Sequence, residues 1–497
     1  MLGKNPDSVI LIQWVQFVPE RVILLPQVSA RELALRILIA VEEEGAYANI
    51  ALHRILEKYR PGKLDRAFTT ELAYGTLRSL NTLDWILARF VKKPLESQTA
   101  AVRNILRLGV YQLIFMDRVP PSAACNEGAE LARKHGHPGS VKFVNGVLRS
   151  VSRQCGEISY PTLLENPLEH ISLRYSHPAW MVKRWLEEFG PEGTIALCCA
   201  NNKPAPNTIR TNTLKITRSD LAERLKAEGL LVSETVYAPE GLKIEGFYSL
   251  GSLASFREGL FQVQDESSML AGRALMPSPG SFVLDACSAP GGKTTHLAQL
   301  MENRGLILGV DIHPHKLSLI EENCLRLGID IVQGRTGDAR TLPEELYNLA
   351  DFVLVDAPCS GLGVLKRRPD ARWRKNPDEL PALVKLQAEI LEGASRCVRD
   401  GGVLVYSTCT LIREENAGQV ENFLAGHPDF ALEDLRAYLP GALDQEGTLA
   451  GGQLQIYPHL HGMDGFFIAR MRKKGSDKRM ENSFIRKEGS STSARQD

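Results

Sequence analysis

Two cysteines follow apolar segments that have the length and composition of buried strands. Cys359 comes after "DFVLVDAP" and Cys409 comes after "GGVLVYST". A free cysteine is most often a small core residue. If the two strands are neighbours in one sheet, however, their ends are about 5 Å apart and both thiols face the same crevice. Such a pair favours nucleophilic chemistry, in which a thiolate forms a transient covalent bond with a substrate.

A glycine-containing loop joins a predicted strand to a predicted helix in "LDACSAPGGKTTHLAQL". The loop does not match a P-loop, because that motif requires a glycine where Cys287 stands, and it contains no G-x-G-x-x-G. Its small residues still allow a ligand to lie against backbone N–H groups at the start of a helix.

Acidic residues recur where the predicted strands end. They are Asp285, Asp311, Asp338 and Asp356. A single aspartate in this position is most simply a helix cap. It can also accept hydrogen bonds from both hydroxyls of a ribose, and ligands of open α/β sheets bind beyond the carboxyl ends of the strands. Four such residues beside one glycine loop predict a nucleoside-type cofactor.

Thiols, a carboxylate and a methyl donor together suit the methylation of a pyrimidine at C5. This carbon is a poor nucleophile, but addition of a thiolate at C6 turns it into an enamine-like carbon that can attack a methyl group. A carboxylate near N3 would stabilise the charge that develops in the ring. A second thiol or a base would help to remove the C5 proton and expel the enzyme.

A basic segment with an embedded tryptophan, "GVLKRRPDARWRKNP", lies between the two cysteines. Such a composition suits phosphate contact and base stacking. A solvated charged loop would have the same composition, and this alternative stays open. The predicted RNA-contacting residues are Lys366, Arg367, Arg368, Arg372, Trp373 and Arg374.

The elements that must position these residues begin near Ser281, where strands and helices start to alternate. Near-continuous apolar strands between helices predict a parallel sheet covered on both faces, which is an α/β domain over residues 276–472. Its last two segments, "LQIYPH" and "GFFIARM", are expected to pair antiparallel at one edge. The polar stretch 473–497 is expected to be disordered.

The preceding part of the chain predicts two further domains. Residues 29–160 show helical periodicity, and Ser29 with Glu32 forms a capping box at the start. Residues 161–275 mix short strands with a helix, which predicts a small α+β domain. Residues 1–28 form an N-terminal extension without an assigned role.

Composition limits the partners and the compartment. The 497 residues contain 59 basic and 59 acidic side chains, so nucleic acid would have to bind a local basic patch. The nine cysteines are an odd number without a C-x-x-C pair, which argues against a disulfide scaffold and a structural zinc site. No apolar run reaches the roughly 18 residues that span a bilayer. We therefore expect a cytoplasmic monomer that uses no metal and contacts no membrane.

The segments "DACSAPGGKT", "GVDI", "LVDAPCSGLG" and "YSTCT" together resemble the NOL1/NOP2/sun family. This family comprises Rossmann-like RNA cytosine-C5 methyltransferases that use S-adenosyl-L-methionine (AdoMet). The resemblance implies that Cys409 is the nucleophile, that Cys359 assists product release and that Asp356 lies at the reaction centre. The residues that it implies for AdoMet binding are Cys287, Ser288, Ala289, Pro290, Gly291, Gly292, Lys293, Asp311, Asp338 and Asp356.

The helical region sharpens the resemblance. "LDRAFTTELAYGTLR" and "VKFVNGVLR" resemble the NusB-type RNA-binding fold, and "RTNTL" and "FQVQDESS" resemble the small RNA-binding unit of the same methyltransferases. Over about residues 29–472 the chain is therefore similar to the RsmB/Sun branch, the bacterial 16S rRNA enzymes. One departure is the missing proline before Glu414 and Glu415, which leaves the thiol unaffected.

This resemblance implies methylation of C5 of a cytosine in 16S rRNA. Because the base must be unstacked to meet a thiol, the expected partner is RNA that is unfolded or not fully assembled. Two alternatives stay open: the same reaction on tRNA, and a non-catalytic NusB-like RNA-binding factor. Retention of both Cys359 and Cys409 disfavours the second alternative, because a binding protein needs neither thiol.

Overall fold

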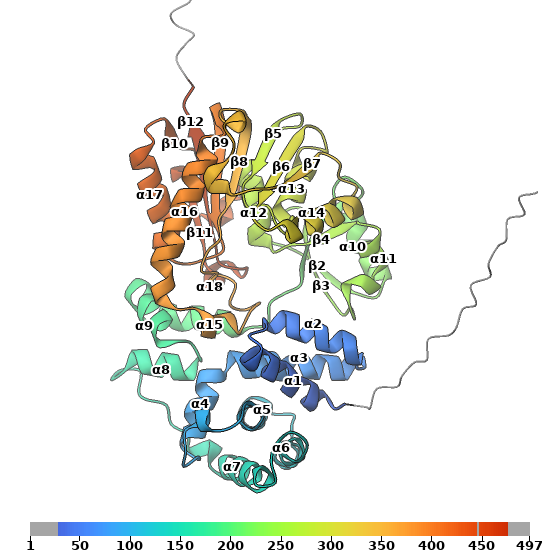
Figure 1. Ribbon diagram of the computed structural model, residues 1–497, viewed down its shortest axis with the longest axis vertical. Coiled ribbons are helices and arrows are strands. Elements are labelled where there is room, and N and C mark those ends of the chain that lie inside the picture. The colour runs from blue at the N-terminus through green and yellow to red at the C-terminus, as the bar shows by residue number, and fades with distance from the viewer. Residues whose placement is uncertain (1–27, 445–446, 476–497) are drawn as a thin grey trace, which may run out of the picture.

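The computed structural model describes residues 28–444 and 447–475 (Figure 1). A helical domain lies at one end of the molecule, a large mixed sheet lies at the other, and a small sheet lies beside the large one (Figure 1). The predicted fold class is thereby confirmed. The N-terminal extension, apart from Val28, and the tail beyond residue 475 lie outside the described residues.

The N-terminal domain is built entirely of helices. Ser29 caps the first one, because its Oγ accepts a hydrogen bond from the backbone N–H of Glu32 at 3.2 Å, as the capping box predicts. The helices are α1 (Ala30–Glu43), α2 (Ala48–Tyr59), α3 (Lys63–Arg78), α4 (Leu80–Ala88), α5 (Ala100–Phe115), α6 (Pro121–His135) and α7 (Ser140–Gln154).

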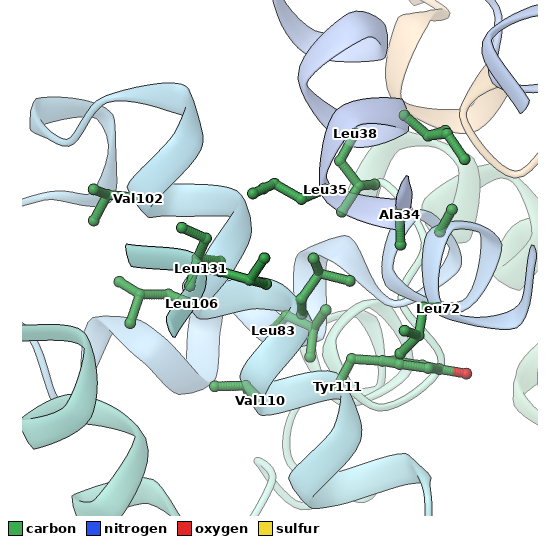
Figure 2. Close-up of a cluster of buried hydrophobic side chains, with 14 of the residues drawn as sticks. Ala34, Leu35, Leu38, Leu72, Leu83, Val102, Leu106, Val110, Tyr111 and Leu131 are labelled. Atoms are coloured by element: carbon green, nitrogen blue, oxygen red, sulfur yellow. The ribbon is translucent and has the colours of Figure 1, made fainter. Parts of the chain in front are cut away.

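Helix α5 lies at the centre of this domain. Figure 2 shows its residues Leu106 and Val110 beside side chains from neighbouring helices, and its Tyr111 next to Leu72 of α3. The helices α5 and α7 approach closely at Gly109, where a Cβ atom would lie 2.5 Å from the Leu148 side chain. Apolar residues at helical spacing thus fold into one core.

Two helices connect this domain to the rest of the chain. They are α8 (Pro167–Arg174) and α9 (Ala179–Asn202). Helix α9 is interrupted at Gly190, which has a φ of 65°, and Pro191 follows. Its buried residues Trp185 and Leu197 share a core with Leu365, which belongs to the C-terminal domain. The connection therefore packs against the C-terminal domain.

The small domain contains an antiparallel sheet in the order β2-β3-β1-β4. Its elements are β1 (Thr208–Thr211), α10 (Arg218–Ala227), β2 (Leu231–Glu234), β3 (Gly241–Glu245), α11 (Ala254–Arg257) and β4 (Phe261–Val263). Helix α12 (Glu266–Leu275) follows, and the expected boundary at residue 275 assigns it to this domain. Its residues Leu270 and Ala274 instead pack in the core of the C-terminal sheet.

The C-terminal sheet has the strand order β10-β12-β9-β8-β5-β6-β7. Strands β5 to β9 run parallel, while β12 runs antiparallel to β9. The strands are β5 (Phe282–Asp285), β6 (Leu306–Asp311), β7 (Val332–Thr336), β8 (Ala350–Asp356), β9 (Val398–Thr408), β10 (Phe430–Leu432), β11 (Gln453–Ile456) and β12 (Phe466–Lys473). The predicted antiparallel pair of β11 and β12 is present, but β12 lies between β9 and β10 and not at the sheet edge.

Helices cover both faces of this sheet. Helices α12, α13 (Gly292–Leu300) and α14 (Pro314–Leu327) share one core with the strands, and α16 (Leu380–Ser395) and α17 (Ala417–Gly426) share the other. Two short helices, α15 (Ala371–Arg374) and α18 (Pro458–His461), lie outside these layers. Strand order reverses between β5 and β8, which is where ligands bind in open α/β sheets.

Candidate active site

The two predicted thiols lie in direct contact. Strands β8 and β9 are parallel neighbours with Asp356 opposite Ser407, and each strand leads into one of the cysteines. The Sγ atoms of Cys359 and Cys409 are 3.3 Å apart, and both residues are partly exposed. The sequence pattern predicted this proximity on the condition that the two strands are neighbours, and the sheet register shows that they are.

The contact makes the two thiols unequal. The hydrogen bond from Cys359 lowers the pKa of Cys409, and the positive charges of Lys293 and Arg368 act in the same direction. The same hydrogen bond, together with burial, raises the pKa of Cys359 well above its ordinary value. The first negative charge of the pair therefore resides on Cys409, while Cys359 keeps its proton.

Asp356 is held in one orientation at the end of β8. Its Oδ2 accepts a hydrogen bond from Nζ of Lys293 at 2.7 Å, and its Oδ1 accepts one from Oγ of Ser407 at 2.9 Å. Lys293 lies in the first turn of α13, so the glycine loop and the end of β8 are joined by an ion pair.

A cleft of about 820 Å³ brings most of the predicted residues together. Those that line it are Cys287, Ala289, Asp311, Asp338, Asp356, Cys359 and Cys409. The other predicted residues of the glycine loop do not line the cleft; they are Ser288, Pro290, Gly291, Gly292 and Lys293. Ser288 donates its hydroxyl to the carbonyl of Val310 at 3.1 Å, and Gly291 has a φ of 96°, which favours glycine.

The four strand-end aspartates have different roles in the structure. Asp311 accepts backbone hydrogen bonds from Ala289 and His313 and faces the cleft. Asp338 caps a short 3₁₀ helix, and its hydrogen bonds with Arg340 lower its pKa. Asp285 is buried below the loop, and burial raises its pKa to about 7. The capping alternative thus holds for Asp338, although this residue also lines the cleft.

The basic segment divides into buried and cleft-facing residues. Lys366 is buried, and its Nζ lies 3.4 Å from Oδ1 of Asp464. Arg367 pairs with Asp464 and Asp265 and also lines the cleft. Arg368 is exposed at the cleft, and no hydrogen bond or ion pair of its side chain is seen within residues 28–444 and 447–475.

The next part of the segment, α15, docks the domains together. Arg372 is fully buried and donates to the carbonyl of Ser176 at 3.0 Å and to Oδ1 of Asn202 at 2.8 Å. The indole N–H of Trp373 donates to the carbonyl of Leu77 at 2.6 Å. The prediction that Arg372 and Trp373 contact RNA does not fit this placement, because their donors are used inside the protein.

The family follows from comparison with known proteins. Residues 272–472 match the 16S rRNA methyltransferase RsmB/F family. The probable ribosomal RNA small subunit methyltransferase B of Bacillus subtilis is 40% identical over 456 residues, which cover 91% of this chain and 100% of that protein. The chain belongs to the RsmB/F family. It is accordingly a methyltransferase that acts on ribosomal RNA of the small subunit.

Further matches extend over the other domains of this RsmB/F protein. Residues 28–153 match the NusB family, and residues 177–250 match the ferredoxin-like domain of the RsmF/B-like methyltransferases. The corresponding Synechocystis protein is 37% identical, with 90% of this chain and 100% of that protein covered. The crystal structure of PH0851 aligns with a TM-score of 0.76 at 30% identity and covers 90% of this chain and 100% of that one.

Sequence reasoning missed a buried carboxylate in this RsmB/F protein that joins the segments carrying Cys359 and Cys409. Glu415 is fully buried and accepts hydrogen bonds from the backbone N–H of Ser360 and from Nε2 of Gln387, both at 2.8 Å. Thr410 also donates to it at 3.3 Å. The one signal in the sequence is the pair Glu414 and Glu415, which follows Cys409 by five residues.

A backbone contact reinforces this link. The N–H of Gly363 donates to the carbonyl of Cys409 at 3.0 Å, and the carbonyl of Gly363 accepts from Gly465 at 2.8 Å. A Cβ atom on Gly363 would lie 2.0 Å from the Gly465 oxygen. The chain can therefore pass through this point only as glycine.

A second interaction missed from the sequence connects the small domain to the glycine loop of this RsmB/F protein. Arg210 on β1 is fully buried and donates to the carbonyl of Gly292 at 2.6 Å and to Oγ1 of Thr295 at 2.9 Å. Its Nε donates to Oε1 of Gln299 at 2.8 Å. One arginine thus fixes the start of α13 from outside the catalytic domain.

Within the described residues, no cluster of three or more histidine, cysteine, aspartate or glutamate side chains could hold a metal ion. None of the helices in these residues is long and apolar enough to cross a membrane.

Proposed function

We propose that this RsmB/F methyltransferase transfers a methyl group from AdoMet to C5 of a cytosine in 16S rRNA, through a covalent bond between Cys409 and C6 of the base. The observation that carries the proposal is the 3.3 Å contact between the Cys359 and Cys409 sulfur atoms in the cleft that also contains Asp356. A protein that only binds RNA has no use for an unequal thiol pair of this kind.

Cys409 attacks as a thiolate, and the hydrogen bond from Cys359 favours this form because it lowers the pKa of Cys409. Its sulfur adds to C6, and the electrons of the C5=C6 bond become available at C5. Asp356, oriented by Lys293 and Ser407, accepts a hydrogen bond from N3 when that nitrogen has taken up a proton from water, and protonation of N3 draws electrons away from C6 as the thiolate adds. AdoMet, when bound, supplies the methyl group as an electrophile.

Cys359 completes the reaction as a base. Once the Cys409 sulfur is bonded to C6, the hydrogen bond between the two thiols no longer stabilises a thiolate. Cys359 first releases its own proton to water, and the resulting thiolate accepts the C5 proton. The electrons of the C–H bond restore the C5=C6 bond, and the bond between C6 and Cys409 breaks. The enzyme regains its Cys409 thiolate, and the methylated base is free.

The residues of the cleft fit AdoMet. Each carboxylate oxygen of Asp311 accepts one backbone hydrogen bond and keeps a lone pair for a ribose hydroxyl. Ile312 and Ile390 supply apolar lining for an adenine ring, and Cys287 and Ala289 offer loop backbone to the methionine part. A solved structure of NSun6 from Pyrococcus horikoshii with SFG, an AdoMet analogue, aligns with a TM-score of 0.54 at 29% identity and covers 60% of this chain and 99% of that one. This similarity supports AdoMet as the cofactor here.

The choice of 16S rRNA over tRNA rests on the appended domains and the relatives. The NusB-like and ferredoxin-like domains precede the catalytic domain, and the similar proteins carry the name of small-subunit rRNA methyltransferases. Arg367, Arg368 and Arg374 line the cleft and supply positive charge for the RNA backbone.

Bisulfite sequencing tests the proposal. Protein-free 16S rRNA and a tRNA pool are incubated with AdoMet and either the wild-type enzyme or Cys409→Ala. We expect one or few new 5-methylcytosines in 16S rRNA and none in tRNA, and a loss of about 10⁴-fold or more in the variant. Near-normal methylation by Cys409→Ala would refute the mechanism, and modification of tRNA alone would refute the substrate.

A further inference from the structure

Tyr47 belongs to the helical domain but lines the cleft of the catalytic domain. It is the residue directly before α2, and 52% of its surface is exposed. Isolated exposed aromatic residues are common on protein surfaces and need no function. The surroundings of Tyr47 set it apart from such a residue.

The backbone around Tyr47 is fixed by the catalytic domain. The guanidinium of Arg374 donates to the carbonyl of Gly45 at 2.8 Å and also to that of Ala46. On the other side, Oδ2 of Asp370 accepts a hydrogen bond from the backbone N–H of Ala48 at 3.2 Å. The turn between α1 and α2 is therefore clamped against α15, next to which α2 lies in Figure 1.

The side chain of Tyr47 remains available to a ligand. The Arg374 guanidinium lies 5.0 Å from the centre of its ring, which is a cation–π contact that holds the ring at the cleft. Within residues 28–444 and 447–475, its hydroxyl makes no hydrogen bond that we observe. Lys375 and Arg368 line the same cleft and bring further positive charge.

We infer that the ring of Tyr47 is a stacking platform for a base of the RNA substrate, next to the cytosine that enters the cleft. An aromatic ring beside basic side chains is the arrangement that binds a single nucleic-acid strand, because each base can stack while its phosphate is neutralised. The target cytosine must reach Cys409 and the cofactor must reach Asp311, so Tyr47 serves a neighbouring nucleotide. The inference rests on the proposed function, because it takes RNA as the substrate.

The assignment gives the helical domain a direct part in substrate recognition. The NusB-like domain does not only bind RNA at a distance from the reaction. Through Tyr47 it contributes one wall of the catalytic cleft, and Arg374 ties that wall to the segment that follows Cys359.

Three variants test the inference: Tyr47→Phe, which keeps the ring, Tyr47→Leu, which keeps the apolar bulk without the ring, and Leu64→Ala as a control. Leu64 is an 85% exposed apolar residue of the same domain that does not line the cleft. Each variant is compared with the wild type for binding of 16S rRNA, for the KM and kcat of methylation, for AdoMet affinity and for thermal unfolding.

We expect Tyr47→Leu to weaken RNA binding and raise the KM for RNA about tenfold, with kcat, AdoMet affinity and the unfolding temperature unchanged. Tyr47→Phe and Leu64→Ala should behave like the wild type. Unchanged RNA binding and KM in Tyr47→Leu would overturn the inference. So would a loss of AdoMet affinity alone, which would assign the ring to the cofactor, or an equal loss in Leu64→Ala.

The outcome is separable from that of the proposed function. If the wild type forms no 5-methylcytosine but its RNA affinity still depends on the ring of Tyr47, the proposed reaction fails and the RNA contact stands. If the wild type methylates 16S rRNA and Tyr47→Leu binds and methylates it equally well, the reaction stands and the stacking platform is refuted.

Discussion

The segments that follow β8 and β9 both carry a thiol into the cleft, but different parts of the molecule hold them in place. The segment after β9 is short, and its fixed points, Glu415 and Asn416, bond to residues of the catalytic domain. The segment after β8 is long, and α15 within it bonds to the helical domain and to α9. Cys409, the proposed nucleophile, is thus positioned by its own domain, and the position of Cys359 also depends on domain docking.

This difference means that the position of Cys409 and the docking of the domains can be changed separately. A change in the β9 segment should act on Cys409 and leave the domain arrangement intact. A change in α15 should weaken the docking between the domains and affect the active site only through the position of the β8 segment. Four experiments test whether the two segments are independent in this way.

The largest effect is expected for Cys359→Ala, which removes the thiol of the β8 segment and leaves the nucleophile. Turnover should fall by about 10²–10⁴-fold, because the base for the C5 proton is lost. The bond between Cys409 and the base still forms, so a protein–RNA adduct should accumulate that survives a denaturing gel.

Its control is the double variant Cys359→Ala/Cys409→Ala, which should form no adduct. An adduct in the double variant would show that another residue attacks the base. Free turnover without an adduct in Cys359→Ala would show that the β8 segment does not assist product release.

Glu415→Ala should have the next largest effect, because it removes a buried carboxylate that hydrogen-bonds to both segments. Ser360 N–H and the amide of Gln387 would lose a buried acceptor, which costs about 2–3 kcal/mol. We expect a lower temperature of thermal unfolding and a loss of methylation, while Glu415→Gln retains part of both. Equal behaviour of Glu421→Ala, an exposed glutamate on α17, would contradict a specific role.

Arg372→Ala tests the docking of the β8 segment alone. Three buried oxygens of Ser176, Asn201 and Asn202 would lose their donor, which costs about 2 kcal/mol. Limited proteolysis should then cut the connection between the helical and small domains faster than in the wild type. Arg436→Ala, which removes an exposed arginine, is the matched control.

Alkylation of Cys409 in the same Arg372→Ala protein sharpens the comparison. If the β9 segment is held by its own domain, the iodoacetamide reaction at this thiol should keep its wild-type rate. A large change in that rate would show that docking and the nucleophile are coupled.

The smallest effect concerns pH. Because only the thiolate reacts with iodoacetamide, alkylation of Cys409 falls as the pH drops through its pKa. That pKa is lowered by the hydrogen bond from Cys359, so the wild type should stay reactive at pH values where ordinary cysteines are protonated. In Cys359→Ala the midpoint should move to higher pH, as measured by mass spectrometry of the Cys409 peptide.

The positions of Cys359 and Cys409 at strand ends could be predicted because they follow from short-range patterns, whereas the order of the strands, in which β12 lies between β9 and β10, could not. An apolar run that ends in a polar turn marks a strand end, and parallel strands present their ends on one side of the sheet. Asp356 and the loop from Cys287 to Lys293 could be found for the same reason.

The roles of Arg372 and Trp373 could not be predicted, because a basic segment has the same composition whether it is exposed to solvent or packed against another domain. Their acceptors, near Leu77 and Ser176, lie about 200 to 300 positions away along the chain. Glu415 was missed for a related reason, since its partner Ser360 precedes it by 55 residues. Burial of a charge depends on such distant donors and leaves no local pattern.

The crossing of backbones at Gly363 has a consequence for engineering this enzyme. Because the obstacle is a carbonyl oxygen of Gly465 and not a side chain, no second substitution in a neighbouring side chain can make room for alanine at position 363. A randomised library over residues 357–375 would therefore retain glycine there in every active clone, while the exposed Arg368, five residues further along the chain, could be replaced without a steric clash. Altered substrate preference is best sought at the cleft-facing positions of that segment, with the crossing point kept constant.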